Sequence, residues 1–231
     1  MKERGMIFNG EMVRAILDGR KTQTRRIMKV QPEPSKSRPG DFWFSSKKLE
    51  SMVHVSDLAP GNSPIADCHL FFQEHCCPFG TVGDRIWVRE TFSGHYLDDD
   101  QIQDIKDGRD KASDLCEYRA DYPNNAQALE GWTPSIHMPR WASRITLEIT
   151  GVRVERLNSI SQEDAQAEGM ELTGWRPTYS DPDSGGEVWT PYDNFAQLWE
   201  SIYGEGSWKA NPWVWVIEFK VVRNVQDNPA R

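Results

Sequence analysis

The spacing of apolar residues along the chain predicts three short helices. In residues 10–18 the apolar side chains fall on one helical face, and Gly19 follows as a natural stop. A second helix is expected to run from the N-cap Ser161, with acidic residues in its first turn, to Gly169. A third covers residues 194–202. Its inward-facing side chains are predicted to be Phe195, Leu198, Trp199 and Ile202.

Alternating apolar and polar residues predict four strands. They cover residues 22–27, 86–92, 143–150 and 213–221. Gly151 permits a bulge or a bend, and the alternation resumes after it. Strands mixed with short helices predict an α+β fold, built as a small, partly open β-barrel with flanking short helices and long loop insertions.

Long polar stretches interrupt these elements. A chain of 231 residues suits one domain with insertions or two small domains. Insertions are expected at about residues 30–80, which are rich in Pro, Ser and Gly, at the acidic residues 93–135, and at 172–190. We therefore predict a single domain over residues 1–222, followed by a flexible tail at 223–231.

The distribution of charge limits the possible partners. A formal net charge of -8 argues against strong non-specific binding to duplex nucleic acid, which requires basic surface. Residues 1–50 carry twelve Lys and Arg against six Asp and Glu, a balance of +6. Residues 97–130 carry four against ten, and residues 161–205 carry one against ten. A local basic site on an acidic body suits a small anionic ligand or a single-stranded segment.

The sequence also predicts a compartment. The N-terminus lacks the apolar stretch of a signal peptide, and no run of residues approaches the length of a membrane span. The four cysteines are then expected to be reduced thiols in a cytosol. We expect a cytoplasmic protein with no membrane partner, and a monomer is the default.

The residues after the first predicted helix carry most of the candidate chemistry. The run from Gly19 to Arg26 places an amine, two hydroxyls and three guanidinium groups within eight residues. A hydroxyl three residues from a lysine can be a nucleophile or a hydrogen-bond donor beside its base, and the arginines suit a phosphate or another planar anion. The alternative is that these residues only end a helix and begin a strand.

Four segments of the chain resemble the ASCH family, a branch of the PUA-like β-barrel superfold. The first is the helix that ends at Gly19–Thr22, with Thr24 and Arg26 after it. The others are residues 83–88, 165–170 and 214–219. The segments lie in family order and cover roughly half of the chain, and the long insertions have no counterpart in the compact members.

Two further segments resemble a longer ASCH subgroup that occurs in phages and prophages. They are residues 77–92, which begin with a Cys-Pro-Phe-Gly turn, and residues 137–145. This second resemblance suggests a bacterial or phage origin for the chain.

Compact bacterial ASCH proteins include an amidohydrolase that removes the acetyl group from N4-acetylcytidine. The resemblance implies a catalytic set of Lys21, Thr24 and Glu168. Three further matching residues are implied to bind the ligand: Arg20, Thr22 and Arg26. Two positions replace apolar residues of the family: Gln23 and Arg25. Other relatives are thought to bind or cut RNA, so the resemblance alone does not fix the reaction.

The implied chemistry is that of a hydroxyl activated by a lysine. A neutral Lys21 would take the proton of Thr24, as in Ser–Lys hydrolases, and Glu168 would hydrogen-bond the leaving amine or the cytosine ring. Lysine acts as a base only when its amine is partly neutral. Burial and the neighbouring arginines are therefore expected to lower the pKa of Lys21.

A second candidate surface involves residues 137–144. The candidate ligand-binding residues are Arg89, His137, Arg140, Trp141 and Arg144. On this interpretation Trp141 stacks on a base, Arg140 or Arg144 binds phosphate, and His137 lies near the pocket mouth. Arg89 and Glu90 lie on opposite faces of one predicted strand, so at most one of them points into any single pocket. The alternative is that the loop only anchors the barrel through Trp141 and Met138.

Cysteines and histidines gather in one short segment. Its members are Cys68, His69, His75, Cys76 and Cys77. Five potential ligands within ten residues can hold zinc. Against a metal site, their spacing matches no common zinc-finger pattern, and Cys77 belongs to the Cys-Pro-Phe-Gly turn. We therefore expect no metal and no cofactor.

Three functions remain open from the sequence. The preferred one is an amidohydrolase for N4-acetylcytidine-type substrates that uses the Lys–Thr–Glu set. The alternatives are a non-catalytic module that binds RNA or a modified base, and a ribonuclease. The acidic net charge favours a small nucleoside, whereas long insertions can extend a cleft around a polymer. The expected partner is a modified nucleoside or single-stranded RNA.

Overall fold

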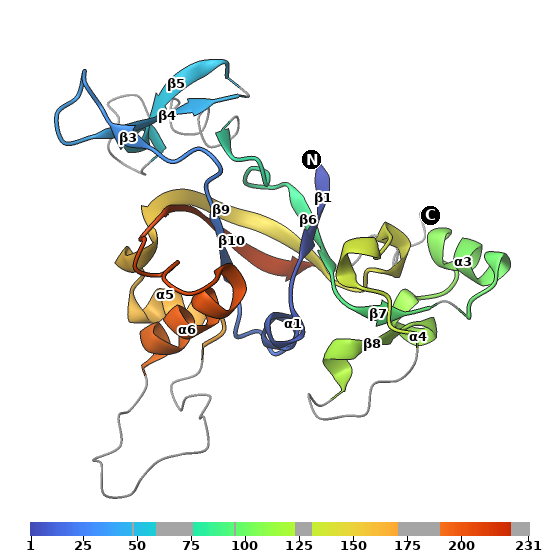
Figure 1. Cartoon of the computed structure of the whole chain (residues 1–231). Helices are drawn as coiled ribbons and strands as arrows, with labels where there is room; N and C mark the ends of the chain where they lie inside the picture. The colour runs from blue at the N-terminus through green and yellow to red at the C-terminus, as the bar shows by residue number, and fades with distance from the viewer. Residues whose placement is uncertain (48, 59–75, 95, 123–130, 171–189, 223–231) are drawn as a thin grey trace, which may run out of the picture. The chain divides into compact units, whose positions relative to one another are not determined.

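The computed structural model describes residues 1–47, 49–58, 76–94, 96–122, 131–170 and 190–222 (Figure 1). These residues form helices and strands in similar proportion, which confirms the predicted α+β class. The chain divides into two compact units, each built from separate stretches of sequence. The first comprises Met1–Gly19, Gly83–Ile149 and Phe219–Arg231, and the second comprises Arg20–Val82 and Thr150–Glu218. The single domain over residues 1–222 stays a prediction.

The first unit is built around three strands. Glu3–Ile7 (β1) pairs in parallel with Arg85–Arg89 (β6), and β6 pairs antiparallel with Thr146–Arg156 (β9), which continues into the second unit. The alternation that predicts this strand is present in the structure. Every second residue of β6 and of its continuation is buried: Ile86, Val88 and Glu90.

The predicted first helix is confirmed as Gly10–Leu17 (α1). Its N-cap is Asn9, whose side chain accepts a hydrogen bond from the amide of Met12 at 2.8 Å. Gly19 follows the helix with a φ of 74°, a conformation that favours glycine. Most of the predicted apolar face is buried, whereas Leu17, in the last turn, is 50% exposed.

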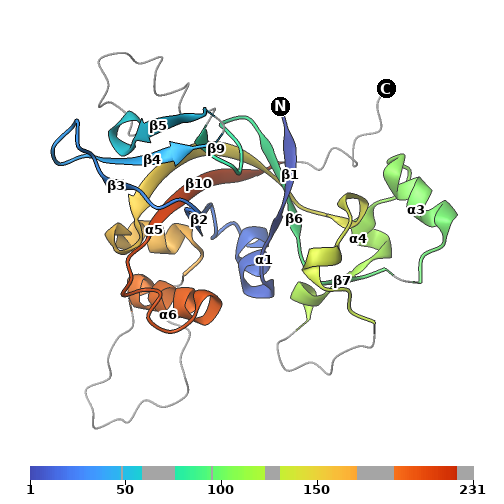
Figure 2. The same cartoon turned by 45° about the horizontal axis from the view of Figure 1, so that its top comes forward.

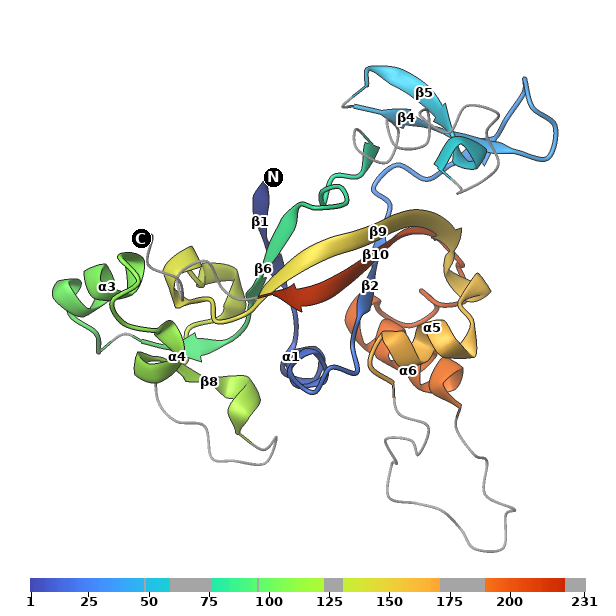
Figure 3. The ribbon, with the colours of Figure 1, turned by 180° about the vertical axis from the view of Figure 1, so that it is seen from behind.

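The second unit packs two helices against a pair of strands. Gln23–Ile27 (β2) pairs antiparallel with Trp213–Val222 (β10). Gln162–Ala167 (α5) and Pro191–Tyr203 (α6) lie side by side (Figures 2 and 3). One apolar core joins these elements: Leu157, Ile160, Ala165, Phe195, Trp199, Val214 and Val216. Ile202, predicted to face inward, is 44% exposed, because the last turn of α6 extends past this core.

Strand β9 is longer than the sequence predicts. It runs as one strand through Gly151, the residue that permits a bulge or a bend. A Cβ at this position would lie 2.6 Å from Oε2 of Glu218, which belongs to the neighbouring β10. The glycine therefore makes room for a side chain of the adjacent strand.

Part of the region 30–80, expected to be a loop insertion, is a small antiparallel sheet. Its strands, and the 3-10 helix after them, are Glu33–Pro34 (β3), Phe42–Ser46 (β4), Ser51–His54 (β5) and Val55–Leu58 (η1). Phe44 and Val53 face each other across β4 and β5 and are 5% and 1% exposed. The abundance of Pro, Ser and Gly around them concealed this short apolar pair.

The acidic region 93–135 also holds regular structure in place of the expected loop. Its elements, with the strand that leads into it, are Phe92–Ser93 (β7), Asp99–Lys106 (α3), Ala112–Leu115 (α4), Glu117–Tyr118 (β8) and Arg119–Asp121 (η2). A capping box between Asp98 and Gln101 starts α3, and Ile105 anchors the helix with no exposed surface. The sequence did not predict this helix, because its many charged residues leave only one short buried face.

Short 3-10 helices complete the described structure. They are Ser135–His137 (η3), Arg140–Ala142 (η4) and Leu157–Ser159 (η5). Among the described helices, none is long and apolar enough to cross a membrane.

The sheets of the described residues are open. The strand order is β1-β6-β9 in the first unit and β9-β10-β2 in the second, so β1 and β2 are edge strands. The predicted barrel is therefore not closed within the part of the chain that is described. Nearly all of the predicted insertion at 172–190, and the predicted tail at 223–231, lie outside the described residues.

Candidate functional site

The C-terminal end of α5 meets the start of β2 in the second unit, and this brings together two of the three residues predicted to be catalytic. Ser161 caps α5, as predicted, by accepting a hydrogen bond from the amide of Asp164 at 3.0 Å. Glu168 is the C-cap of the same helix. Lys21 forms an antiparallel β-bridge with Glu168. A local cap therefore starts the helix that carries Glu168, and a long-range bridge brings Lys21 to it.

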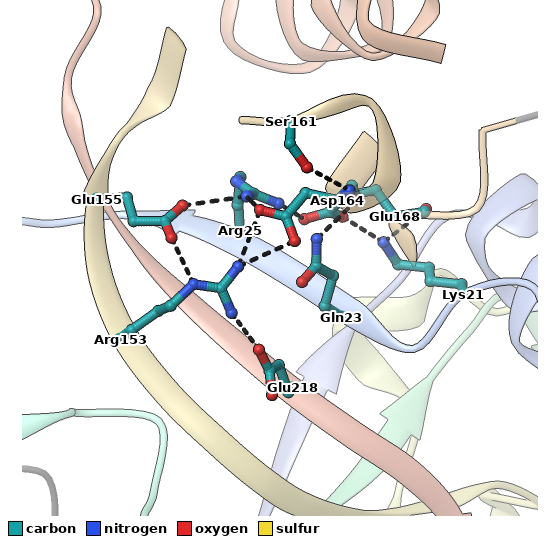
Figure 4. A network of polar contacts seen from close by, with 9 residues as sticks. All are labelled: Lys21, Gln23, Arg25, Arg153, Glu155, Ser161, Asp164, Glu168 and Glu218. Carbon is teal, nitrogen blue, oxygen red and sulfur yellow. Dashed lines mark hydrogen bonds and ion pairs between the residues drawn. The ribbon is translucent and has the colours of Figure 1, made fainter. Parts of the chain in front are cut away.

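Lys21 and Glu168 form a buried ion pair (Figure 4). Lys21 Nζ lies 2.6 Å from Glu168 Oε2, and it also donates to the backbone carbonyl of Glu168 at 3.0 Å. The two side chains are 0% and 2% exposed. Burial lowers the pKa of the Lys21 amine; Glu168 opposes this effect, and the charges of Arg26 and Arg25 add to it. This direction agrees with the sequence-based expectation.

Arg25 links the ion pair to carboxylates of α5 and β9. Its guanidinium donates from Nη1 to Glu168 Oε1 at 3.1 Å. From Nη2 it donates to Asp164 Oδ2 at 2.9 Å and to Glu155 Oε2 at 3.2 Å. Each carboxylate oxygen of Glu168 is therefore engaged by a cation of the protein.

Arg153 extends the network along β9 (Figure 4). Its Nη2 donates to both carboxylate oxygens of Asp164, at 3.1 and 3.0 Å, and its other nitrogens pair with Glu155 and Glu218. The network holds three cations, Lys21, Arg25 and Arg153, and four carboxylates, Glu155, Asp164, Glu168 and Glu218. Exposure rises from 0% at Lys21 to 45% at Glu218, so the network runs from the interior to the surface.

Thr24, the third residue predicted to be catalytic, lies on the other face of β2. Gln23 donates to the backbone carbonyl of Asp164 at 2.7 Å, and Arg25 also reaches α5. Because successive residues of a strand point to opposite sides, Thr24 faces away from the helix that carries Glu168. It is buried, at 1% exposure. The structure thus brings Lys21 to Glu168 but does not bring the Thr24 hydroxyl to them.

The three predicted ligand-binding residues near Lys21 differ in their surroundings. Arg20 is exposed and donates from Nη1 to the carbonyl of Gly169 at 2.8 Å. Thr22 is also exposed. Arg26 is half-buried and shares the face of β2 that carries Thr24. Their role in ligand binding stays a prediction.

In the first unit, the predicted ligand-binding arginines make contacts within the protein. Arg89 donates from Nε to the carbonyl of Ser135 at 3.1 Å and also donates to the carbonyl of Ile136. Arg140 forms a bidentate pair with Glu3, at 2.8 and 2.9 Å. These contacts fasten residues 135–140 to β6 and β1, and they occupy the guanidinium edges that a phosphate would use.

Arg144 lies between two carboxylates and an aromatic ring. It forms bidentate pairs with Glu90, at 2.9 and 3.0 Å, and with Asp121, at 2.7 and 2.8 Å. Its guanidinium lies 3.9 Å from the centre of the Tyr118 ring. Burial raises the pKa of Glu90, and the contacts with Arg144 oppose that rise. Glu90 is thus an internal ion-pair partner of Arg144, a residue that was predicted to bind phosphate.

Trp141 and His137 have different surroundings. Trp141 is half-buried and packs edge-to-face on Phe92, with ring centroids 6.3 Å apart. Met138 is 2% exposed in the same core. These contacts fit the alternative in which the loop anchors the fold. His137 is exposed at the end of its 3-10 helix.

The cysteine and histidine segment is only partly described. Cys68, His69 and His75 lie outside the described residues, whereas Cys76 and Cys77 are buried. Within the described part of the chain, no three His, Cys, Asp or Glu side chains are grouped so as to hold a metal ion.

No family model matches the chain, and no similar curated protein or solved structure was found. The resemblance to the ASCH family therefore stays a prediction. The candidate site is defined by its own geometry.

Sequence reasoning missed the partners of the Lys21–Glu168 pair. Arg25 was noted as a replacement for an apolar residue and as a charge that lowers the pKa of Lys21, but not as a partner of Glu168. It shares a strand face with Gln23. Asp164 lies one helical turn before Glu168, so it is presented on the same side of α5. These two periodicities were the available signal. No local sequence signal indicated that Glu155 and Arg153 of β9 approach the site, because long-range strand pairing places them there.

Proposed function

We propose that this chain is an ASCH-type protein with a PUA-like fold, and that it hydrolyses an N4-acetylcytidine-type amide. The observation that carries the proposal is the buried contact between Lys21 Nζ and Glu168 Oε2, at 2.6 Å. Lysines that act as bases are often buried, because burial favours the neutral amine, and here burial outweighs the opposing effect of Glu168 on the pKa of Lys21. The same two residues belong to the catalytic set that the resemblance implies.

In the proposed reaction, the neutral amine of Lys21 takes a proton from the attacking nucleophile. The nucleophile adds to the acyl carbon, the bond to the cytosine amine breaks, and the proton passes to that amine. Glu168 orients the Lys21 amine rather than the substrate, because both of its oxygens already accept from Lys21 and Arg25. The position of Thr24 on the opposite strand face favours water as the nucleophile.

Turnover of N4-acetylcytidine by three variants separates these roles. We expect Glu168→Gln to lower kcat by about 10²-fold or more, because the base loses its orienting charge. Thr24→Val keeps the shape of the side chain and removes the hydroxyl, and it should retain turnover if water attacks. If Thr24→Val loses turnover, the Thr24 hydroxyl rather than water is the nucleophile. Full turnover in Glu168→Gln would contradict the proposal.

A non-catalytic module that binds a modified base is the second candidate. It is favoured by the burial of the ion pair, since Lys21 is 0% exposed and a substrate reaches the amine only if the covering residues move. Binding without turnover is the result that this candidate predicts. A titration with N4-acetylcytidine and with single-stranded RNA at two salt concentrations would identify it, because RNA affinity falls steeply with salt.

A ribonuclease has less support than either of these. Cleavage of a phosphodiester needs cations that are available to the phosphate. Arg25, Arg140 and Arg144 are each engaged by carboxylates of the protein.

A further inference from the structure

Arg25 occupies the centre of the network around the candidate site. Its side chain is 0% exposed, and its two terminal nitrogens reach three carboxylates. The guanidinium also lies 5.9 Å from the centre of the Phe195 ring, in the apolar core of the second unit. A charge is costly in such a place unless it is fully paired, so the contacts of Arg25 are tightly constrained.

We propose that Arg25 is a positioning residue, which holds one carboxylate oxygen of Glu168 so that the other remains on the amine of Lys21. The proposal deepens the proposed function and rests on it for its consequence in catalysis. Its structural part concerns only Arg25, Glu168 and Lys21 and is tested without turnover.

The division of the Glu168 carboxylate carries the argument. Oε2 lies 2.6 Å from Lys21 Nζ, and Oε1 lies 3.1 Å from Arg25 Nη1. Two cations on separate oxygens fix the plane of the carboxylate, which a single partner would leave free to rotate. The planar fork of arginine suits this task, because its other terminal nitrogen, Nη2, donates to Asp164 and Glu155 at the same time.

Arg153 provides a matched comparison within the same network. Like Arg25 it pairs with Asp164 and Glu155, but its contacts are with those two residues and Glu218. Removal of either arginine takes one positive charge from the network. Only the removal of Arg25 takes a contact from Glu168.

The titration of Lys21 reports on this arrangement. The charged groups that act on its amine are Glu168 from α5 and Arg25 and Arg26 from β2. Arg25 disfavours the protonated amine by direct repulsion. Without Arg25, that repulsion disappears and Glu168 is left to Lys21 alone. Both electrostatic changes favour the ammonium form, so the midpoint of the Lys21 titration moves to higher pH. The loss of positioning shows separately, as exchange broadening of the Lys21 signal once the Glu168 carboxylate is free to rotate.

The experiment is a nuclear magnetic resonance titration of lysine side chains labelled with ¹³C at Cε, in which the spectrum of Lys21→Met identifies the Lys21 signal. We expect Arg25→Met to move the midpoint of Lys21 upward and Arg153→Met to leave it nearly unchanged. Equal shifts in the two variants would overturn the proposal, because the effect would then be that of network charge alone. No shift in Arg25→Met would overturn it as well.

Two further measurements keep the test decisive. If Arg25→Met does not fold, Arg25→Lys replaces it, since a lysine retains the charge but cannot hold all three carboxylates. The Lys21 midpoint in Arg25→Lys should then stay near that of the wild type, while exchange broadening of the Lys21 signal increases. A sharp, unchanged signal would contradict a positioning role.

The catalytic consequence is read separately. If the protein hydrolyses N4-acetylcytidine, Arg25→Lys should lower kcat by about tenfold or more with little change in KM, because Arg25 is buried and acts through Glu168. If the wild type shows no turnover, the proposed function fails, whereas the titration still decides whether Arg25 positions Glu168.

Discussion

At the scale of single residues, the charge of the Lys21 amine is destabilising where it lies, because the side chain is fully buried. Moving an ammonium group and a carboxylate out of water costs several kcal/mol each by general estimates (~5 kcal/mol), and their attraction repays this only when the geometry is good. Two apolar side chains of similar size in the same place would often give a protein of equal or higher stability. The contact between Lys21 and Glu168, with Arg25 behind it, is therefore weak evidence for a role in stability, and it is the feature on which the proposed base role of Lys21 rests.

The buried pair of the first unit gives a stability prediction. Arg144→Met should destabilise the protein by about 3–5 kcal/mol, because it leaves Glu90 as an uncompensated buried carboxylate. Glu90 is 2% exposed, and Arg144 is its bidentate partner. Unfolding in urea, followed by tryptophan fluorescence, measures the change.

The control for that variant is Arg109→Met. Arg109 is 62% exposed and pairs with Asp104 and Asp107 at the surface, so its removal should cost less than about 1 kcal/mol. Equal losses of unfolding free energy in Arg109→Met and Arg144→Met would show that the buried Glu90–Arg144 pair contributes no more to stability than a surface pair.

Asp164 gives a pH prediction. Burial alone would raise its pKa, but the charges of Arg25 and Arg153 and the hydrogen bonds from Gln23 and Arg25 outweigh this and hold the pKa below its ordinary value. A carboxyl with a lowered pKa in the folded state adds stability above its unfolded value of about 3.9, and this stability is lost as the pH falls through the folded value.

Wild-type stability should therefore fall more steeply below about pH 4 than that of Asp164→Asn, whose side chain does not titrate. Urea midpoints measured in steps from neutral to acid pH test this. Glu205→Gln, at an exposed position, is the control and should follow the wild-type curve. Parallel curves for wild type and Asp164→Asn would be inconsistent with the pairing of Asp164 described for the folded state.

At the scale of elements, local sequence signals predicted several helix ends and strands correctly, but the alternation of side chains along β2 was not applied to the candidate site. The cap at Ser161, the stop at Gly19 and the alternation in β6 are local, and each is present in the structure. Lys21 and Thr24 were grouped because they are three residues apart. In an extended chain an odd separation places two side chains on opposite faces, so the strand predicted at 22–27 already argued against that grouping.

The short helix α5 gives a prediction at this scale. Ser161→Ala removes the hydroxyl that accepts from the amide of Asp164 at 3.0 Å, and it should cost about 1 kcal/mol of stability. Ser201→Ala, at an exposed position in α6, should change stability by less than about 0.5 kcal/mol. Chemical unfolding of both variants checks the difference, and a larger loss in Ser201→Ala would contradict the assigned cap.

At the scale of the whole molecule, composition concealed structure in two regions. The Pro-, Ser- and Gly-rich region 30–80 and the acidic region 93–135 were expected to be insertions, yet each contains short elements around a few buried side chains. Short strands and helices of this kind are stabilised by tertiary packing rather than by local propensity. Long-range pairing likewise supplied the acidic partners of the predicted basic site. Neither effect can be obtained from one stretch of sequence.

The most direct test of the central claim, that Lys21 acts as a base beside Glu168, is turnover of N4-acetylcytidine by the wild type and by Lys21→Met, followed by mass spectrometry. We predict that the wild type releases cytidine and that Lys21→Met does not. Equal release by both proteins would remove Lys21 from the reaction. No release by either would contradict the amidohydrolase and leave the binding module as the function to pursue.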